Sequence, residues 1–151
     1  MIKKTFAVIA ILLLLLAPLI QFLVGSVIAR VIFKDERPPK EDIFSFVTDN
    51  KELLLSCIES GNYDAFADSE MVKSAYPYSG SVKFFCGGFG IVPSGGTRGF
   101  YYSPDDDMTS ASYISGVELV PSGDGWAMEQ GDNYYYTELI CDHFYYYDEV
   151  D

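Results

Sequence analysis

The chain has 151 residues and a formal net charge of −12 at pH 7, and twelve acidic residues but no lysine or arginine follow Arg98. Nucleic-acid binding requires clustered cations that displace phosphate counterions, so this composition excludes nucleic acid as a partner. It also disfavours a domain that lies flat on anionic lipid. The partners that it favours are cationic, although an acidic surface can also serve only to keep an exposed domain in solution.

An apolar run, Phe6–Ala29, dominates the N-terminal part; only Gln21 and Ser26 interrupt it, and it contains no charged residue. A helix of this length extends roughly 36 Å, compared with about 30 Å for the hydrocarbon core of a bilayer. The two lysines at positions 3 and 4 precede it. We therefore expect residues 1–33 to form a single-pass transmembrane signal-anchor, with the lipid bilayer as partner through Phe6–Ala29.

A cleaved signal peptide is the competing interpretation, because Val27 and Ala29 could form a small-residue cleavage site before Arg30. The apolar part of a signal peptide spans about 7–15 residues, however, and this run is longer. Orientation is also open. The cations that follow the run favour a cytoplasmic domain, whereas the short N-terminal tail favours translocation. We expect the C-terminal domain to be extracytoplasmic.

Residues 34–42 form a charged linker that contains two consecutive prolines, and residues 43–151 form a small acidic domain. A helix is expected from about Lys40 to Ser60, since apolar residues recur there at spacings of three to four. Asn50 is a weak point at which this helix could break, and Gly61 is its expected stop. The apolar face of the helix is expected to pack on a sheet.

Beyond residue 60, a short helical turn over 71–75 and a turn over 76–80 come before the sheet. Alternating patterns then predict short strands separated by Gly, Asp and Asn turns, which is typical of an antiparallel meander. The glycine-rich stretch 87–96 is expected to form a flexible connection or a bulged hairpin. The fold class is α+β: an N-terminal transmembrane helix followed by a helix packed on an antiparallel β-meander of about five to six strands. The strands are expected over 81–86, 98–103, 114–120, 126–130, 134–141 and 144–149.

Few residues suggest chemistry. The chain lacks a phosphate-binding glycine loop and a nucleophile elbow, and His143 is its only histidine. A nucleophilic pair of Cys141 with His143 is conceivable only if no turn separates them. We therefore expect no enzymatic activity and no cofactor. Cys86 and Cys141 could form a disulfide, but free thiols are the simpler expectation for three cysteines without metal spacing.

Three consecutive carboxylates on a loop are the best candidate for a metal site. Such a cluster suits a hard cation such as Ca²⁺, although the spacing of an EF-hand loop is missing and a solvated turn is the simpler interpretation. The candidate ligands are Asp105, Asp106 and Asp107.

Two tyrosine triplets are the most distinctive feature of the chain. Within each triplet the middle side chain points away from the outer two, so both faces of the sheet carry tyrosine. One face is expected to pack on the helix, and the other to expose amphipathic rings suited to binding. Cross-strand pairing that only stabilises the sheet is the alternative. The candidate binding surface consists of Tyr134, Tyr135, Tyr136, Tyr145, Tyr146 and Tyr147.

The stretches Phe-Tyr-Tyr-Ser-Pro-Asp-Asp (100–106) and Gly-Asp-Asn-Tyr-Tyr-Tyr-Thr-Glu (131–138) resemble small uncharacterised bacterial proteins with a single N-terminal span. The resemblance implies a single-span membrane protein and no particular activity. Our leading hypothesis is a membrane-anchored, non-catalytic interaction module that binds a cationic protein or peptide through an acidic, tyrosine-rich sheet. The alternatives are a divalent-cation-binding envelope protein built on 105–107 and an immunity-type protein that neutralises a basic toxin.

Overall fold

The computed structural model describes residues 34–151 except 67, 92–93, 115 and 117. Residues 35–151 form a compact unit of their own. The predicted anchor Phe6–Ala29 lies outside the described residues. Among the residues that are described, no helix is long and apolar enough to cross a membrane.

The predicted helix is interrupted at Asn50, as expected from its weak helix propensity. Helix α2 spans Lys40–Asp49 and helix α3 spans Lys51–Ser60. The Asn50 side-chain amide donates to the carbonyl of Phe46 at 2.8 Å, so it competes for a helical acceptor. Gly61 ends α3 in the left-handed conformation, with φ of 67°. The short 3-10 helix η1, Asp64–Phe66, follows.

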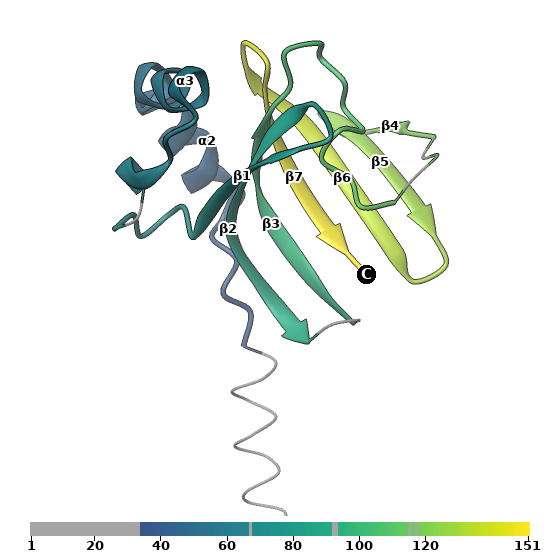
Figure 1. Ribbon diagram of the computed structural model, residues 1–151. Helices are drawn as coiled ribbons and strands as arrows, with labels where there is room; N and C mark the ends of the chain where they lie inside the picture. The colour runs from purple at the N-terminus through teal and green to yellow at the C-terminus, as the bar shows by residue number, and fades with distance from the viewer. Residues whose placement is uncertain (1–33, 67, 92–93, 115, 117) are drawn as a thin grey trace, which may run out of the picture. The chain divides into compact units, whose positions relative to one another are not determined.

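The described residues form one antiparallel sheet of seven strands in the spatial order β1-β2-β3-β7-β6-β5-β4. The α+β class is therefore confirmed, but a single consecutive meander is wrong. Strands β1–β3 and β4–β7 are two meanders, and the last strand of the chain pairs with β3 in the middle of the sheet (Figure 1). The strands are β1 Ser74–Tyr78, β2 Ser81–Ile91, β3 Ser94–Tyr102, β4 Val120–Ser122, β5 Gly125–Gln130, β6 Asn133–Cys141 and β7 Phe144–Val150.

Several local expectations are corrected. The predicted helical turn over 71–75 is wrong, because β1 begins at Ser74, and the turn after β1 is confined to Ser79 and Gly80. Strand β2 continues through the glycine-rich stretch with a bulge between Phe85 and Gly87, as the bulged-hairpin alternative predicts. The strand expected over 114–120 is wrong, because only its last residue, Val120, belongs to a strand among the described residues.

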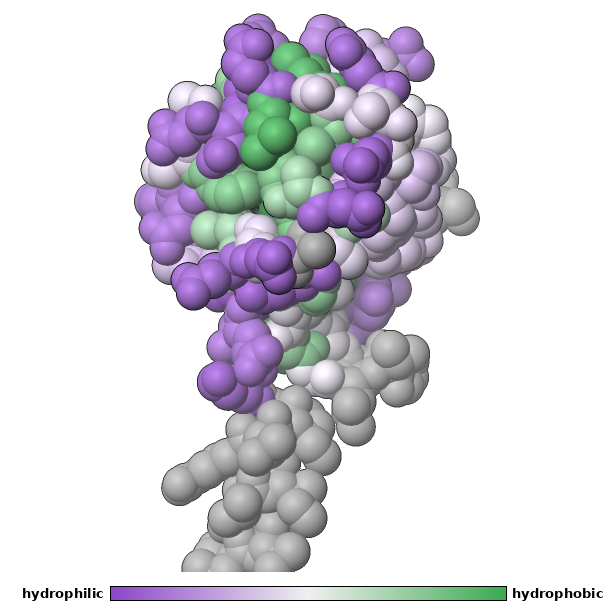
Figure 2. All heavy atoms as spheres, turned by 60° about the vertical axis from the view of Figure 1, so that its left-hand side comes forward, coloured by the Kyte–Doolittle hydropathy of each residue, from purple (hydrophilic) through white to green (hydrophobic). Residues whose placement is uncertain are grey.

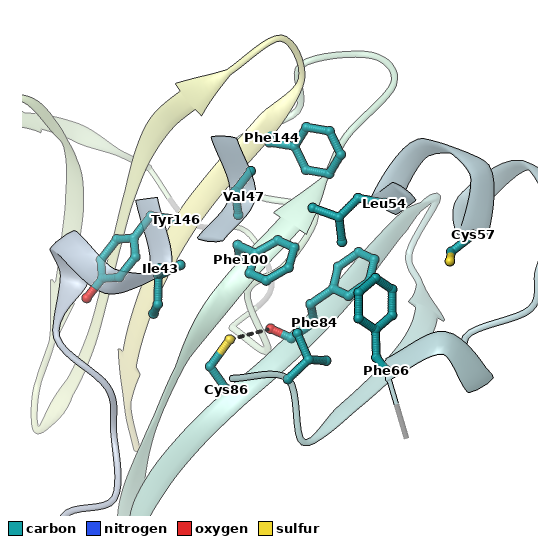
Figure 3. Close-up of a cluster of buried hydrophobic side chains, with 11 residues drawn as sticks. Ile43, Val47, Leu54, Cys57, Phe66, Phe84, Cys86, Phe100, Phe144 and Tyr146 are labelled. Atoms are coloured by element: carbon teal, nitrogen blue, oxygen red, sulfur yellow. Dashed lines mark hydrogen bonds between the residues drawn. The ribbon is translucent and has the colours of Figure 1, made fainter. Parts of the chain in front are cut away.

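Helices α2 and α3 pack on one face of the sheet, which we call the helix face. Ile43, Val47 and Leu54 from the helices are fully buried against phenylalanines of β2, β3 and β7 (Figure 3). Phe84 and Phe100 stack there with ring centroids 4.6 Å apart and an interplanar angle of 9°. The expected packing of the helix on the sheet is thus confirmed, and this apolar layer is the main core of the domain.

The segment predicted as a linker, 34–42, is largely folded onto the domain. The amide of Glu36 donates to the carbonyl of Gly88 at 3.1 Å. A Cβ on Gly87 would lie 2.3 Å from the Glu36 carbonyl oxygen, so only glycine allows this crossing. The Arg37 guanidinium lies 4.4 Å from the centroid of the Phe89 ring and 2.8 Å from Asp148. Residues 35–38 therefore belong to the domain.

Candidate functional site

The face of the sheet opposite the helices, which we call the tyrosine face, is buried as well. Its cover is the stretch 103–119, which we call the covering segment. This segment contributes Ala111 to a second buried cluster, and its partly buried Met108, Ile114 and Leu119 pack against that cluster. The sheet contributes Tyr101, Met128, Tyr135, Tyr145 and Tyr147.

The six tyrosines proposed as a binding surface do divide between the two faces, as the alternation predicts. Tyr135, Tyr145 and Tyr147 point to the tyrosine face, whereas Tyr146 and Tyr136 pack at the helix face. The expectation that one face exposes its rings is wrong. Tyr135, Tyr145, Tyr146 and Tyr147 are each at most 6% exposed, because both faces are covered. Only Tyr134 and Tyr136 are half-buried.

The buried tyrosine hydroxyls hold the covering segment in place. Tyr101 and Tyr135 both donate to the backbone carbonyl of Met108 at 3.0 Å. Tyr101 also shares a 2.8 Å hydrogen bond with the hydroxyl of Thr137. Burial raises the pKa of Tyr101 to about 12, so this hydroxyl stays protonated at neutral pH and acts as a donor. These rings are therefore part of the internal packing.

An ion pair that the sequence analysis missed lies under the same cover. Lys83 and Glu149 each have a side chain that is 1% exposed, and Lys83 Nζ lies 3.2 Å from Glu149 Oε2. Both side chains also bind the covering segment. Lys83 donates to the carbonyl of Ala111 at 2.8 Å, and Glu149 Oε1 accepts from the amide of Tyr113 at 2.8 Å.

Aromatic rings surround the buried ammonium group. Lys83 Nζ lies 3.9 Å from the centroid of the Tyr113 ring and 4.3 Å from that of Tyr147, within the range of a cation–π contact. Burial lowers the pKa of Lys83 and raises that of Glu149, while the attraction between the two charges opposes both shifts. Since neither group reaches solvent, the pair serves to position the covering segment. The only sequence signal is that Lys83 is the sole charged residue between Lys73 and Arg98.

Beside this pair, the covering segment and the end of β1 line an open polar hollow of about 330 Å³. Its one ionisable carboxylate, that of Asp107, already accepts hydrogen bonds from the amide and hydroxyl of Thr109. Among the residues that line the hollow, Asp107 is the one with a charged side chain. The hollow is lined by Tyr78, Ser79, Asp107, Thr109, Ser110, Ser112, Tyr113, Ile114 and Gly116.

The three carboxylates proposed as metal ligands have separate surroundings. Asp106 Oδ1 lies 2.8 Å from both the Tyr145 hydroxyl and His143 Nδ1, and these bonds, first that of Tyr145, lower the pKa of Asp106. Asp107 binds Thr109, and Asp105 is exposed. Within the described part of the chain, no group of three or more His, Cys, Asp or Glu side chains is placed to hold a metal ion.

The cysteines and the histidine do not form a nucleophilic site. Asp142 and His143 make the two-residue turn between β6 and β7, with φ of 24° and 65°, so a turn separates Cys141 from the His143 side chain. All three cysteines are free, as the simpler expectation predicts. Burial raises the pKa of Cys86 to about 12 and also raises that of Cys141. These two thiols are therefore poor nucleophiles at neutral pH.

The cations of residues 35–151 are all engaged within the domain. Five of them form ion pairs with acids, and Lys73 bonds the backbone carbonyl of Glu70. This unit contains six cations and all 22 acids of the chain, which gives a net charge of −16. The electrostatic potential around this unit is therefore negative. The ion pairs are Arg37 with Asp35 and Asp148, Lys40 with Glu138, Lys51 with Asp142, Lys83 with Glu149, and Arg98 with Asp148.

Comparison with known proteins adds no relative. No protein-family model matches the chain, and neither the search of curated proteins nor the search of solved structures returned a match.

Proposed function

We propose that this protein is a membrane-anchored, non-enzymatic binding module whose acidic domain binds a cationic protein or peptide. The observation that carries the proposal is the charge distribution of residues 35–151: a net charge of −16, with each cation held in an internal ion pair or backbone hydrogen bond. An uncompensated field of this kind accelerates association with partners of opposite charge and repels partners of like charge.

The non-enzymatic part of the proposal is supported by how the polar groups of the domain are used. The buried pair Lys83–Glu149 holds the covering segment, and Asp106 binds Tyr145 and His143. Among the described residues, these interactions join groups of the domain to one another and do not converge on an open cavity. A nucleophile with a matched base needs such convergence.

The anchoring part of the proposal rests on Phe6–Ala29, whose length and lack of charge are typical of a membrane-spanning helix. We propose that the domain is extracytoplasmic. A reporter enzyme that is active only outside the cytoplasm, fused after Asp151, is expected to be active. If that fusion is inactive and a fusion to a reporter that works only in the cytoplasm is active, the proposed orientation is reversed. Release of the domain into the medium would support signal cleavage.

Crosslinking in intact cells, followed by identification of the trapped protein, tests the binding function. We expect a basic partner whose recovery falls as the salt concentration rises, since screening weakens interactions between exposed charges. A variant chain in which exposed acids are replaced by their amides should lose the partner, whereas the native chain should retain it. Recovery of this protein alone would contradict the proposal.

A further inference from the structure

The helical layer of the domain has a one-sided distribution of charge. Its two lysines pair with acids of β6 and of the turn that follows it: Lys40 with Glu138 and Lys51 with Asp142. Its six acids are all exposed, and none of them forms an ion pair among the described residues. Among the described residues, the charges of α2, α3 and η1 that have no ion-pair partner are therefore all acidic. These acids are Glu41, Asp42, Asp49, Glu52, Glu59 and Asp64.

Apolar side chains lie among these acids. Leu53 is 45% exposed, whereas Phe46 and Leu55 are half-buried because they also pack against the core of the helix face. Figure 2 looks onto the side of the domain that carries the helices and shows apolar atoms gathered in one area with hydrophilic side chains around it. Residues three or four positions apart are neighbours within one helix, which places Asp42 one turn from Phe46 in α2 and Glu59 one turn from Leu55 in α3.

We propose that this outer surface of α2 and α3, which we call the helix surface, is the docking site for a cationic amphipathic helix. The apolar side of that helix would pack on the exposed side chain of Leu53, and its lysines or arginines would pair with the surrounding acids. In this mode of recognition, apolar anchors slow dissociation and surrounding charges steer the encounter. The inference rests on the proposed function, because it names the partner class and the place on the domain.

Charge complementarity favours this occupant over the others that an apolar surface could accept. Anionic lipid would be repelled by the six acids. A second copy related by a two-fold axis would bring the same acidic surface against itself, which is also repulsive. A neutral apolar peptide would bury the acids without compensating their charge. A helix with apolar and basic sides satisfies both parts of the surface.

The test uses the full chain in nanodiscs of zwitterionic lipid and a fluorescein-labelled amphipathic helix built of leucine and lysine as the probe, with empty discs subtracted. The triple variant Asp42→Asn, Asp49→Asn and Glu59→Gln is expected to weaken binding about tenfold. The matched control, Asp105→Asn, Asp124→Asn and Asp132→Asn, removes the same charge from exposed turns outside the helices and is expected to weaken binding less than about threefold. Circular dichroism checks that each variant folds.

Leu53→Ala keeps the charge and removes the most exposed apolar side chain of the helix surface. We expect it to weaken binding about fivefold. Equal losses from the two triple variants would overturn the helix surface while leaving an acidic cation-binding domain intact. A native chain that does not bind the probe would overturn the proposed function itself. Self-association, or binding to anionic discs, that Leu53→Ala abolishes would assign the surface to another occupant and also overturn the inference.

Discussion

The two faces of the sheet are both buried, but by covers of different kinds. Two helices cover the helix face, and their backbone hydrogen bonds are internal, so Phe84 and Phe100 need only supply apolar surface. The covering segment over the tyrosine face has no helix or strand among its described residues. Its backbone groups need partners when they are buried, and Tyr101, Tyr135, Lys83 and Glu149 supply them.

The difference explains why Tyr101 and Tyr135, rather than phenylalanines, lie under the covering segment. A tyrosine ring provides nearly the same apolar area as phenylalanine and adds a hydroxyl that can reach an irregular backbone. Tyr101 and Tyr135 thus provide the hydrogen bonds that a cover without regular structure needs. The comparison leads to five predictions, which begin with the two largest expected effects on the free energy of unfolding and end with the smallest.

Phe100→Ala is expected to reduce the free energy of unfolding by about 3–5 kcal/mol, because it opens a cavity in the apolar core of the helix face. The Phe100 side chain is fully buried and stacks on Phe84. Chemical denaturation of the full chain in detergent would measure the loss. Val120→Ala, at an exposed position, is the control and should change stability by less than about 0.5 kcal/mol. A loss below about 1 kcal/mol for Phe100→Ala would mean that the helices are not a rigid cover.

Lys83→Met is expected to cost about 3–5 kcal/mol, because it leaves the Glu149 carboxylate buried without its counter-charge. Adding Glu149→Gln should recover most of this loss, since the neutral amide oxygen can still accept from the Tyr113 amide. A double-mutant cycle measures the coupling. Two losses that simply add would show that the pair does not act as a unit.

The single variant Lys83→Met should also show a characteristic pH dependence. Burial raises the pKa of Glu149, and loss of Lys83 removes the charge that opposes this shift. The variant is therefore expected to be most stable below the pKa of an unfolded glutamate and to lose stability as pH rises through the raised pKa. The double variant should lack this dependence, and its persistence there would contradict the assignment to Glu149.

Tyr101→Phe and Tyr147→Phe form a matched pair on the tyrosine face. The Tyr101 hydroxyl makes two hydrogen bonds, so Tyr101→Phe is expected to lower the free energy of unfolding by about 1–1.5 kcal/mol. The Tyr147 hydroxyl is buried without a partner, so Tyr147→Phe should be neutral or stabilising by up to about 1 kcal/mol. Thermal unfolding of both variants measures the difference. The reverse order would disprove the role given to the hydroxyls.

The Asp35 carboxyl is expected to have the smallest effect on the free energy of unfolding. Its titration tests whether residues 35–38 are folded as part of the domain. The hydrogen bond from Arg37 lowers the pKa of Asp35 to about 2, from an ordinary value of 3.8. Because the folded pKa is the lower one, the stabilisation is present above pH 4 or so and is lost as pH falls toward 2. The group is largely exposed, so the effect is small. Titration of the Asp35 carboxyl by NMR would measure it, with Asp35→Asn as the control.

Local patterns in the sequence predicted the features that depend on chain neighbours. The helices with their break at Asn50, the end of α3 at Gly61, and strands β5 to β7 all follow from periodicity and from residues suited to turns. The strand expected over 114–120 was wrong, because alternation alone does not distinguish a strand from a covering segment. The exposure of the tyrosine rings was mispredicted for the same reason, since it depends on which segments cover them.

Composition and local pattern by themselves determined the acidic character of the domain, its class, its two helices and the prediction of an anchor at Phe6–Ala29. Only the tertiary structure decided that β7 lies beside β3, that both sheet faces are covered and that Lys83 meets Glu149. The physical reason is the range of the interactions. Propensity and periodicity act over a few residues, whereas burial and charge pairing depend on segments that are far apart in the chain and meet only in the folded domain.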